Sequence, residues 1–490
     1  MKLKNVIIAL ATTVGLIAPV SAVSAKAINV KALTSVTLNI YNWEDYMYES
    51  DEKDGSAPSV INQFVTYAAS ELNLDVNVNY TTFSTNEDMY NAYALGKGNY
   101  DLIAPSEYMI MRMIREDMLQ ELNYDLLPNY KQYASHYFQH ALEEVSIDKY
   151  TAGYMWGTVG LVYNPLASSD TTKMHEDMKS WSSLWNPTYK GLISIKDSMR
   201  DTYLIALGYI YQHELTRLNK WRSEGLLTNE QYNEELTSIL NRTDDLTLSL
   251  VDKALQGLKQ NYFGLEVDSG KNDMITGKVA INTAWSGDAV YAMDTAEEET
   301  GVELYYSLPS EGSNIWFDGW VIPKNAKNVD VAHHFIDFVS QPEIAALNMD
   351  YIGYTSAIAG DAVYDQVKDW YEASPEEIDE NSILVDLTYF FEGTVSEGKD
   401  LTFYSNYVGR QLTAQYPSAE EISRLVIMQD FGDRNDAVIA IWTSFKSTTL
   451  TWWVWLVLIL VAILIAIYII RSVIKKQKSA RHSRRRKAKA

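Results

Sequence analysis

Residues 37–46 read TLNIYNWEDY and residues 100–108 read YDLIAPSEY. The segment from 37 to 108, which these two stretches begin and end, decides the fold. Apolar residues are arranged there as in short strands, at 37–41, 75–80 and 100–104. Two intervening segments, 59–72 and 86–95, repeat apolar residues with the spacing of amphipathic helices. Strands separated by helices of this length predict βαβ units and a mostly parallel sheet, which is an α/β fold.

The same alternation continues along most of the chain. Further strands are predicted at 190–195, 278–284, 303–307 and 319–322. Further helices are predicted at 202–218, 228–240, 246–260, 329–339 and 342–347. The charged segment 214–241 has helical spacing and is interpreted as a solvated helical hairpin. Because no linker composition separates these elements, two closely connected α/β lobes are expected rather than independent domains.

Aromatic residues stand beside carboxylates or hydroxyls at several predicted strand ends, where ligands bind in open α/β sheets. These groups lie at 42–46, 105–108, 285–288 and 315–318, with further acids at 197 and 201. A ring face attracts an ammonium group by about 0.5–2 kcal/mol, and a hydrogen bond to a charged group adds about 1.5–3 kcal/mol. Each motif alone is more typical of a core aromatic beside a solvated acid. Together, the motifs favour an extended organic cation as the ligand.

Several longer stretches resemble the periplasmic spermidine/putrescine-binding proteins of polyamine ABC importers. The resemblance covers roughly 38–446 in consistent order. It is carried by YNWEDY at 41–46, YDLIAPSEY at 100–108, WSSLWNPTYKG at 181–191, WFDGWVIP at 316–323 and IGYT at 352–355. The resemblance implies a two-lobed, type II-like periplasmic-binding-protein fold whose chain crosses repeatedly between lobes. Lobe 1 is expected at 36–155 and 316–360, and lobe 2 at 156–315 and 361–446.

The resemblance also implies the ligand-binding residues. Trp43 and Tyr46 are similar to first-lobe walls of the family's site, and Trp285 and Trp316 to rings that pack on the methylene chain. Asp318 resembles the central amine-binding carboxylate. The other expected contacts are Asp201 at a second amine, with Glu44, Ser106, Tyr108, Asp288, Tyr354 and Gln429.

Three positions depart from the family pattern. Glu44 stands where Ser or Thr is usual, and Ser198 stands at an acid's place with Asp197 beside it. Asp288 is more similar to the putrescine-preferring members. These differences leave the choice between spermidine and putrescine open.

Both ends of the chain carry targeting signals. Lys2 and Lys4 precede an apolar run and small residues, which predicts a signal peptide at 1–25. Near the other end, 451–470 contains no charged residue and has the ~20 residues that a bilayer span needs. A transmembrane helix is therefore predicted at 450–470. Ten basic residues and no acids follow from Arg471, so the tail 471–490 is predicted to be cytoplasmic, with a single pass and the binding domain outside.

Composition excludes several classes of function. The chain has no cysteine, which excludes disulfides, thiol catalysis and a lipid-modified N-terminal cysteine. Its 64 acidic residues outnumber 41 basic ones, and such a charge balance disfavours nucleic acid as a partner. No phosphate-binding loop or nucleophile motif is present, so no catalytic residue, metal or cofactor is expected.

The predicted function is a membrane-anchored, extracytoplasmic solute-binding protein. It would capture spermidine or putrescine between its lobes and deliver it to the permease and ATPase subunits of an ABC importer, with the C-terminal helix as its contact to the membrane. Three alternatives stay open: a membrane-bound sensor of polyamines or other organic cations, a choline or betaine binder, and a secreted carbohydrate-active protein.

Overall fold

The computed structural model describes residues 33–50, 56–96, 98–447, 459–461 and 463–472. The chain divides into two units, residues 1–438 and 439–490. The first unit is a mixed α/β structure built on one large sheet with the strand order β2-β1-β3-β10-β5-β8-β6-β7. The predicted signal peptide at 1–25 and nearly all of the predicted tail lie outside the described residues.

The first half of the sheet is parallel and comes from the opening βαβ units. Strand β1 (Thr34–Trp43) pairs with β2 (Leu74–Phe83) along its length and with β3 (Leu102–Ile103) on its other side. The connecting helices are α1 (Val60–Glu71) and α2 (Asn86–Ala94), whose side-chain caps are Ser59 and Thr85. The strands and helices predicted here are confirmed, with ends shifted by a few residues.

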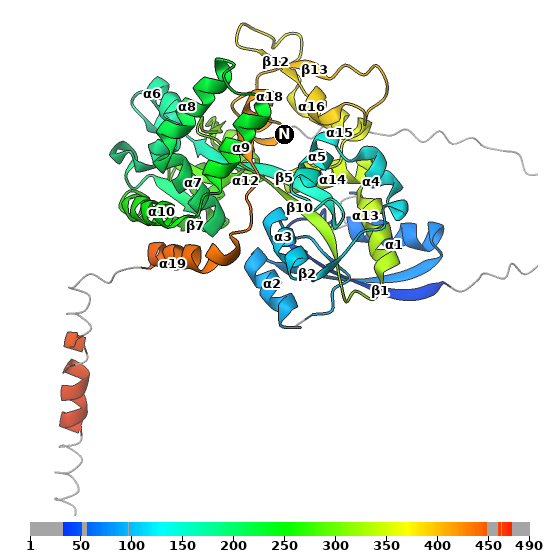
Figure 1. Cartoon of the computed structure of the whole chain (residues 1–490), viewed down its shortest axis with the longest axis horizontal. Helices are drawn as coiled ribbons and strands as arrows, with labels where there is room; N and C mark the ends of the chain where they lie inside the picture. Colours follow the sequence, from blue (N-terminus) through cyan, green and yellow to red (C-terminus); the bar gives the residue numbers. More distant parts are fainter. Residues whose placement is uncertain (1–32, 51–55, 97, 448–458, 462, 473–490) are drawn as a thin grey trace, which may run out of the picture. The chain divides into compact units, whose positions relative to one another are not determined.

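Two long antiparallel strands, β5 (Thr151–Tyr163) and β10 (Ser313–Pro323), connect the halves of the sheet. The end of β10 pairs with β3, whereas the end of β5 pairs with β8 (Ile281–Trp285). Figure 1 shows both strands between helices α7 and α10 on one side and α1 and α2 on the other. The two halves of the sheet therefore form the cores of two lobes that share these strands.

Burial explains why the sequence analysis missed β5 and predicted only a short part of β10. Every residue of both strands is buried. A strand that is covered on both faces loses the alternation of polar and apolar residues on which the prediction depends.

The second half of the sheet contains three short strands. Strand β6 (Ile193–Lys196) pairs in parallel with β7 (Gly264–Glu266) and β8. The helices of this lobe include α7 (Met199–Ile210), α8 (Gln212–Ser223), α9 (Asn229–Leu240), α10 (Asp245–Leu258), α11 (Ser269–Ile275) and α12 (Ser286–Thr300). The predicted helix 202–218 is two helices, α7 and α8, which meet at Tyr211. The predicted hairpin at 214–241 is confirmed as α8 and α9.

The remaining elements are four short strands that pair with the large sheet, a separate two-stranded sheet, and further helices. They are α3 (Glu107–Arg115), β4 (Leu119–Gln120), α4 (Pro128–Tyr133), α5 (His136–Glu144), α6 (Thr171–Asp177), β9 (Tyr305–Ser307), α13 (Val329–Val339), α14 (Pro342–Ile352), β11 (Thr355–Ser356), α15 (Asp361–Tyr371), β12 (Ile383–Asp386), α16 (Thr388–Phe391), β13 (Thr402–Ser405), α17 (Gln411–Gln415), α18 (Ala419–Ile422), β14 (Leu425–Val426) and α19 (Asn435–Lys446).

The predicted C-terminal transmembrane helix at 450–470 requires a correction. In the part of the chain that the structure describes, no helix has the length and apolar character to cross a bilayer. Helix is described in this region at 459–461 and 463–472. Residues 450–458 and 462 of the predicted helix lie outside the described residues. The membrane attachment, the single pass and the cytoplasmic C-terminus derived from this helix are therefore not supported.

Candidate ligand-binding site

The centre of the candidate site is the carboxylate of Asp318, in the middle of β10. The ladder between β10 and β5 shifts register directly after this residue. Asp318 is 4% exposed, and its carboxylate accepts hydrogen bonds from Tyr46 Oη at 2.8 Å and Ser106 Oγ at 2.6 Å. Burial raises the pKa of Asp318 to about 7, although both hydrogen bonds act in the opposite direction. Both donors are neutral hydroxyls, so within the described part of the chain this carboxylate forms no ion pair that would stabilise its charged form.

The starts of two helices hold Ser106 in place. Ser106 precedes α3, and Asn86 is the first residue of α2. The Asn86 amide nitrogen donates to Ser106 Oγ at 2.9 Å and to Tyr108 Oη at 3.0 Å, while the Ser106 N–H donates to Asn86 Oδ1 at 3.1 Å. The structure thus joins the predicted residues Tyr46, Ser106, Tyr108 and Asp318 through one network, in which Asn86 was not predicted.

A second buried acid, Glu107, lies next to this network. One carboxylate oxygen accepts from the Phe317 N–H at 3.1 Å. Burial raises the pKa of Glu107 to about 8, with a further contribution from the negative charge of Asp318. At neutral pH Glu107 is therefore mostly protonated and adds little negative charge to the site.

Aromatic rings form one wall beside Asp318. The ring centroid of Tyr354 lies 5.7 Å from that of Tyr46 and 5.3 Å from that of Trp316. Two glycines let these rings approach the backbone. A Cβ atom added to Gly287 would lie 2.4 Å from the Tyr354 ring, and one added to Gly157 would lie 2.6 Å from the Trp316 ring. The wall therefore depends on glycine at positions 157 and 287 as well as on the rings themselves.

A second predicted carboxylate, Asp201, is buried in the first turn of α7. It accepts hydrogen bonds from Trp285 Nε1 at 2.9 Å and Asn314 Nδ2 at 3.2 Å. Burial raises the pKa of Asp201. Asn314 belongs to the same strand as Asp318, four residues earlier, which is a separation of about 13 Å along an extended strand. The alternate residues Asn314, Trp316 and Asp318 share one face of β10, so an aromatic ring lies between the two acidic positions.

The third predicted carboxylate, Asp288, is paired with a lysine that the sequence analysis did not identify. Lys196 ends β6 and is 1% exposed. Its Nζ lies 2.5 Å from Asp288 Oδ2 and 4.4 Å from the ring centroid of Trp285. The sequence could have indicated Lys196 by its position at the carboxyl end of a predicted strand, next to Asp197.

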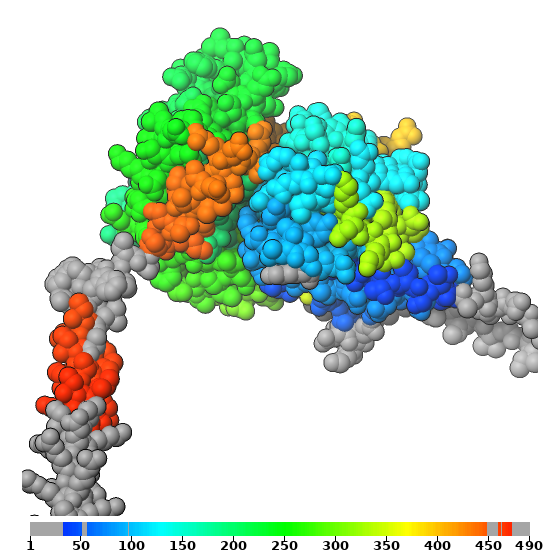
Figure 2. All heavy atoms as spheres, turned by 60° about the horizontal axis from the view of Figure 1, so that its bottom comes forward, coloured from blue at the N-terminus to red at the C-terminus, as the bar shows by residue number. Residues whose placement is uncertain are grey.

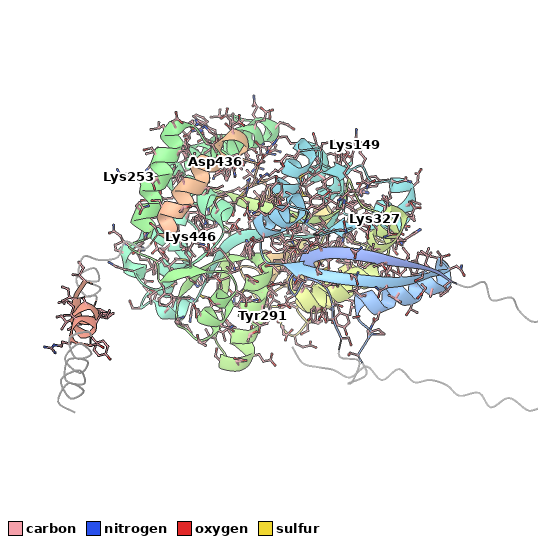
Figure 3. All side chains as sticks on the ribbon, turned by 90° about the horizontal axis from the view of Figure 1, so that it is seen from below. Lys149, Lys253, Tyr291, Lys327, Asp436 and Lys446 are labelled. Atoms are coloured by element: carbon pink, nitrogen blue, oxygen red, sulfur yellow. The ribbon has the colours of Figure 1, made fainter. Side chains whose placement is uncertain are left out.

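Lys271 lies on the outer side of the same carboxylate. Its Nζ is 3.6 Å from Asp288 Oδ1 and 2.6 Å from Asp268 Oδ1. It also lies 5.2 Å from the ring centroid of Tyr291, an exposed residue of α12 that Figure 3 labels. Tyr354 Oη is 3.4 Å from Asp288 and completes its surroundings. Asp288 therefore has two positive partners within the chain.

Arg200 connects the two lobes, and sequence reasoning also missed it. Its guanidinium group lies 3.9 Å from the ring centroid of Tyr108 on α3 and 4.2 Å from that of Phe431. It pairs with Asp430 at 3.6 Å and donates to the backbone carbonyl of Gln429. The segment around these residues, orange in Figure 2, lies on the green helices. Gln429 itself is exposed, and its described partners contact its backbone.

Two other predicted residues have their described contacts elsewhere. Trp43 packs against Phe83, with ring centroids 4.6 Å apart. Glu44 is exposed and accepts a hydrogen bond from Ser84 at 3.0 Å. The structure therefore does not bring these two side chains into the network around Asp318, and their contact with a ligand stays a prediction.

The site is closed by its own side chains. Tyr46, Asp201, Trp316 and Asp318 are all buried. A surface hollow of about 480 Å³ lies elsewhere, lined by Tyr93, Ala94, Gly96, Asp117, Met118, Lys324 and Asn325. Access to Asp318 thus requires the groups packed around it to separate.

Comparison with known proteins identifies relatives with similar sequences. The spermidine/putrescine-binding periplasmic protein of Salmonella typhimurium is 27% identical over 326 residues, which cover 65% of this chain and 76% of the relative. The putrescine-binding periplasmic protein PotF of Escherichia coli is 26% identical over 344 residues, covering 70% and 83%.

Solved structures of proteins with related names are also similar to this chain. The spermidine/putrescine ABC transporter substrate-binding protein PotD from Streptococcus pneumoniae has a TM-score of 0.54 and 26% identity, over 84% of this chain and 98% of that one. A putative spermidine/putrescine ABC transporter protein from Listeria monocytogenes has a TM-score of 0.56 and 26% identity, with the same coverage. These similarities confirm the resemblance found in the sequence and the two-lobed fold. The family model described as "Bacterial extracellular solute-binding protein" matches residues 63–376, which is most of the chain, and this protein therefore belongs to that family.

Proposed function

We propose that this protein is an extracytoplasmic receptor that captures a polyamine, spermidine or putrescine, between its two lobes and delivers it to the permease of an ABC importer driven by ATPase subunits. The observation that carries the proposal is the buried carboxylate of Asp318, which has two hydroxyl partners and an aromatic wall. A ligand ammonium group would supply the missing positive charge.

The arrangement along β10 suits an extended diamine or triamine. One ammonium group would pair with Asp318, and the methylene chain would pack on Trp316, which lies on the same face of the strand. A second ammonium group would pair with Asp201, which hydrogen-bonds Asn314 at the other end of this row. Each ammonium–carboxylate hydrogen bond contributes about 1.5–3 kcal/mol, and the ring adds about 0.5–2 kcal/mol.

Lobe movement would admit the ligand. Tyr46 and Ser106 come from the first half of the sheet, whereas Asp201 and Trp285 come from the second. Among the described strands, β5 and β10 run through both halves. Bending of these two strands would separate the Arg200–Tyr108 stack and expose Asp318. Closure around the ligand would then rebuild these contacts, so capture changes no covalent bond.

The relatives favour uptake over the alternatives. Their names describe binding proteins for spermidine and putrescine, and those of the solved structures refer to ABC transporters. Uptake, unlike sensing, requires an ABC permease that accepts the loaded protein.

Titration calorimetry on the purified full-length chain tests the proposal. Putrescine or spermidine at micromolar concentration should give saturable heat with one site, while choline and a neutral sugar should give none. Absence of heat with both polyamines would overturn the proposed ligand class. Uptake of labelled polyamine by cells that lack the gene, compared with cells that carry it, would test delivery separately.

A further inference from the structure

We propose that the Lys196 side chain is a built-in cation that fills one amine position of the site, so that the site selects a short diamine over a triamine. The inference rests on the proposed function, because it concerns which polyamine the same site selects. It gives a ligand-specificity role to a residue that the family resemblance did not indicate.

Lys196 makes the contacts that this site would otherwise offer to a ligand amine. Its Nζ donates to Asp288 Oδ2 at 2.5 Å and to the Val267 carbonyl at 2.6 Å, and it lies 3.3 Å from Glu266 Oε1. These acceptors use all three N–H groups of an ammonium ion. The Trp285 ring, 4.4 Å away, completes an aromatic and acidic environment of the kind that binds primary amines.

The carboxylates of the site therefore differ in whether lysines of the chain already pair with them. The hydrogen bonds described for Asp318 and Asp201 come from neutral hydroxyl, indole and amide donors, and the charge of Lys196 acts on Asp201 without a direct ion pair between them. Asp288 has the ammonium groups of Lys196 and Lys271. Of these three carboxylates, two thus form no ion pair with a lysine of the described residues, and two is the number of charges on a short diamine.

A triamine would meet an electrostatic obstacle at this end of the site. On binding, its third ammonium group would lose its contacts with water and would have no free carboxylate as a new partner, which is costly in a buried site. It would also approach the like charge of Lys196, since Lys196 already lies beside the Trp285 ring. Specificity of this kind comes from repelling the wrong ligand rather than from added contacts with the right one.

A purely structural role for Lys196 makes a different prediction. If the lysine only held β6, β7 and α12 together, its removal would weaken the binding of every ligand in the same proportion. The ratio of the two affinities therefore separates the two roles. The replacement Lys196→Met should be tolerated, because Glu266 keeps hydrogen bonds from the Gly270 N–H at 2.8 Å and Asn282 at 3.1 Å. Asp288 keeps Lys271.

The test is calorimetry with putrescine as the diamine and spermidine as the triamine, on the full-length wild-type chain and two variants. The wild type should bind putrescine more tightly. Lys196→Met should shift the ratio of the two Kd values towards spermidine by roughly tenfold to a hundredfold, the value of one charged hydrogen bond. Lys196→Arg keeps the positive charge and should shift the ratio much less. An unchanged ratio in a folded Lys196→Met protein would overturn the inference.

A second comparison avoids any change to the lysine. Asp288→Asn should weaken putrescine binding clearly less than Asp318→Asn, because the chain's own lysines already use Asp288. Equal losses would identify Asp288 as an amine ligand and overturn the inference. A wild type that binds spermidine at least as tightly as putrescine would also overturn it, while leaving the proposed function in place. A wild type that binds neither polyamine would contradict the proposed function, and the inference would fail with it.

Discussion

The Asp318 and Asp288 regions look alike in the sequence and differ in the structure. Each has an acid two or three residues after a tryptophan, near the end of a predicted strand. Asp318 is surrounded by hydroxyl groups, whereas Asp288 is paired with a lysine 92 positions earlier in the chain. Two acids in similar local sequence thus differ in whether their negative charge is free to pair with a ligand. The groups that contact each acid in the folded chain determine this difference, and the local motif does not.

The largest expected effect is at the Asp318 region. Asp318→Asn removes the negative charge but keeps the size of the side chain, so polyamine affinity should fall roughly tenfold to a hundredfold. Calorimetry gives the Kd. Asp75→Asn is a matched control, because it makes the same chemical change at an exposed position near the opposite end of the β1–β2 pair. A similar loss in both variants would show that overall charge, rather than this contact, drives binding.

A titration sharpens the same comparison. An ammonium group binds the ionised form of Asp318, whose pKa is about 7 without ligand, so affinity should fall about tenfold from pH 8 to pH 6. Stability of the ligand-free protein should change in the opposite direction. Because this pKa lies above the ordinary value of 3.8, the protein loses stability as pH rises from about 4 to about 7.

Two measurements check this linkage. Binding heats in buffers with different ionisation enthalpies should reveal proton release near pH 6, and thermal unfolding should show the opposite trend in stability. The pH dependence of affinity should largely disappear in Asp318→Asn. The trend in stability should weaken but remain, because burial also raises the pKa of Glu107, to about 8. If the dependence of affinity persists, a group other than Asp318 controls it.

The aromatic wall should contribute less than the carboxylate. Trp316→Ala removes a ring face and should weaken binding by about two- to thirtyfold, following about 0.5–2 kcal/mol for a cation–π contact. Trp316→Phe should retain most of the affinity, because the buried indole N–H has no described hydrogen-bond partner. Trp221→Ala, at an exposed position on α8, controls for loss of a tryptophan. Equal losses for the Ala and Phe variants would contradict a role for the ring face.

The smallest expected effect is next to Asp288. Gly287→Ala would place a methyl group against the Tyr354 ring and displace it, so affinity should fall by a few-fold at most. Gly264→Ala is the matched control, because a Cβ atom there meets no other atom within 4 Å. Calorimetry on the two variants measures the effect. Unchanged affinity in Gly287→Ala would show that the position of Tyr354 does not matter for binding.

The sequence allowed the prediction of elements with clear periodicity and of residues at strand ends. The helices at 59–72, 228–240 and 329–339 match the observed ones within two residues. The structure joins Asp318 and Tyr46 by a hydrogen bond, while their role in one ligand site stays a prediction. Local pattern was sufficient in these places, because the preference of the chain and the fold agree.

The parts of the fold and of the site that the sequence did not predict depend on contacts between residues far apart in the chain. Strand β5 has no alternation, because both of its faces are buried. Lys196 and Arg200 look like ordinary surface residues in the sequence, and only the pairing of β6 with β7 and β8 buries the lysine beside Asp288. Asn86 appeared only as the first residue of a helix, and its role in holding Ser106 and Tyr108 requires the third dimension.

The spacing of Asn314, Trp316 and Asp318 on one strand has a consequence for how this receptor can evolve. Substitutions at these positions can retune the ligand one contact at a time, because each residue projects separately from the same face. Insertion or deletion of one residue within the row would turn the residues beyond it to the other side of the sheet. Divergence in this strand is thus constrained to exchange of side chains at fixed length, and relatives with new ligands should differ here in composition while keeping the same number of residues.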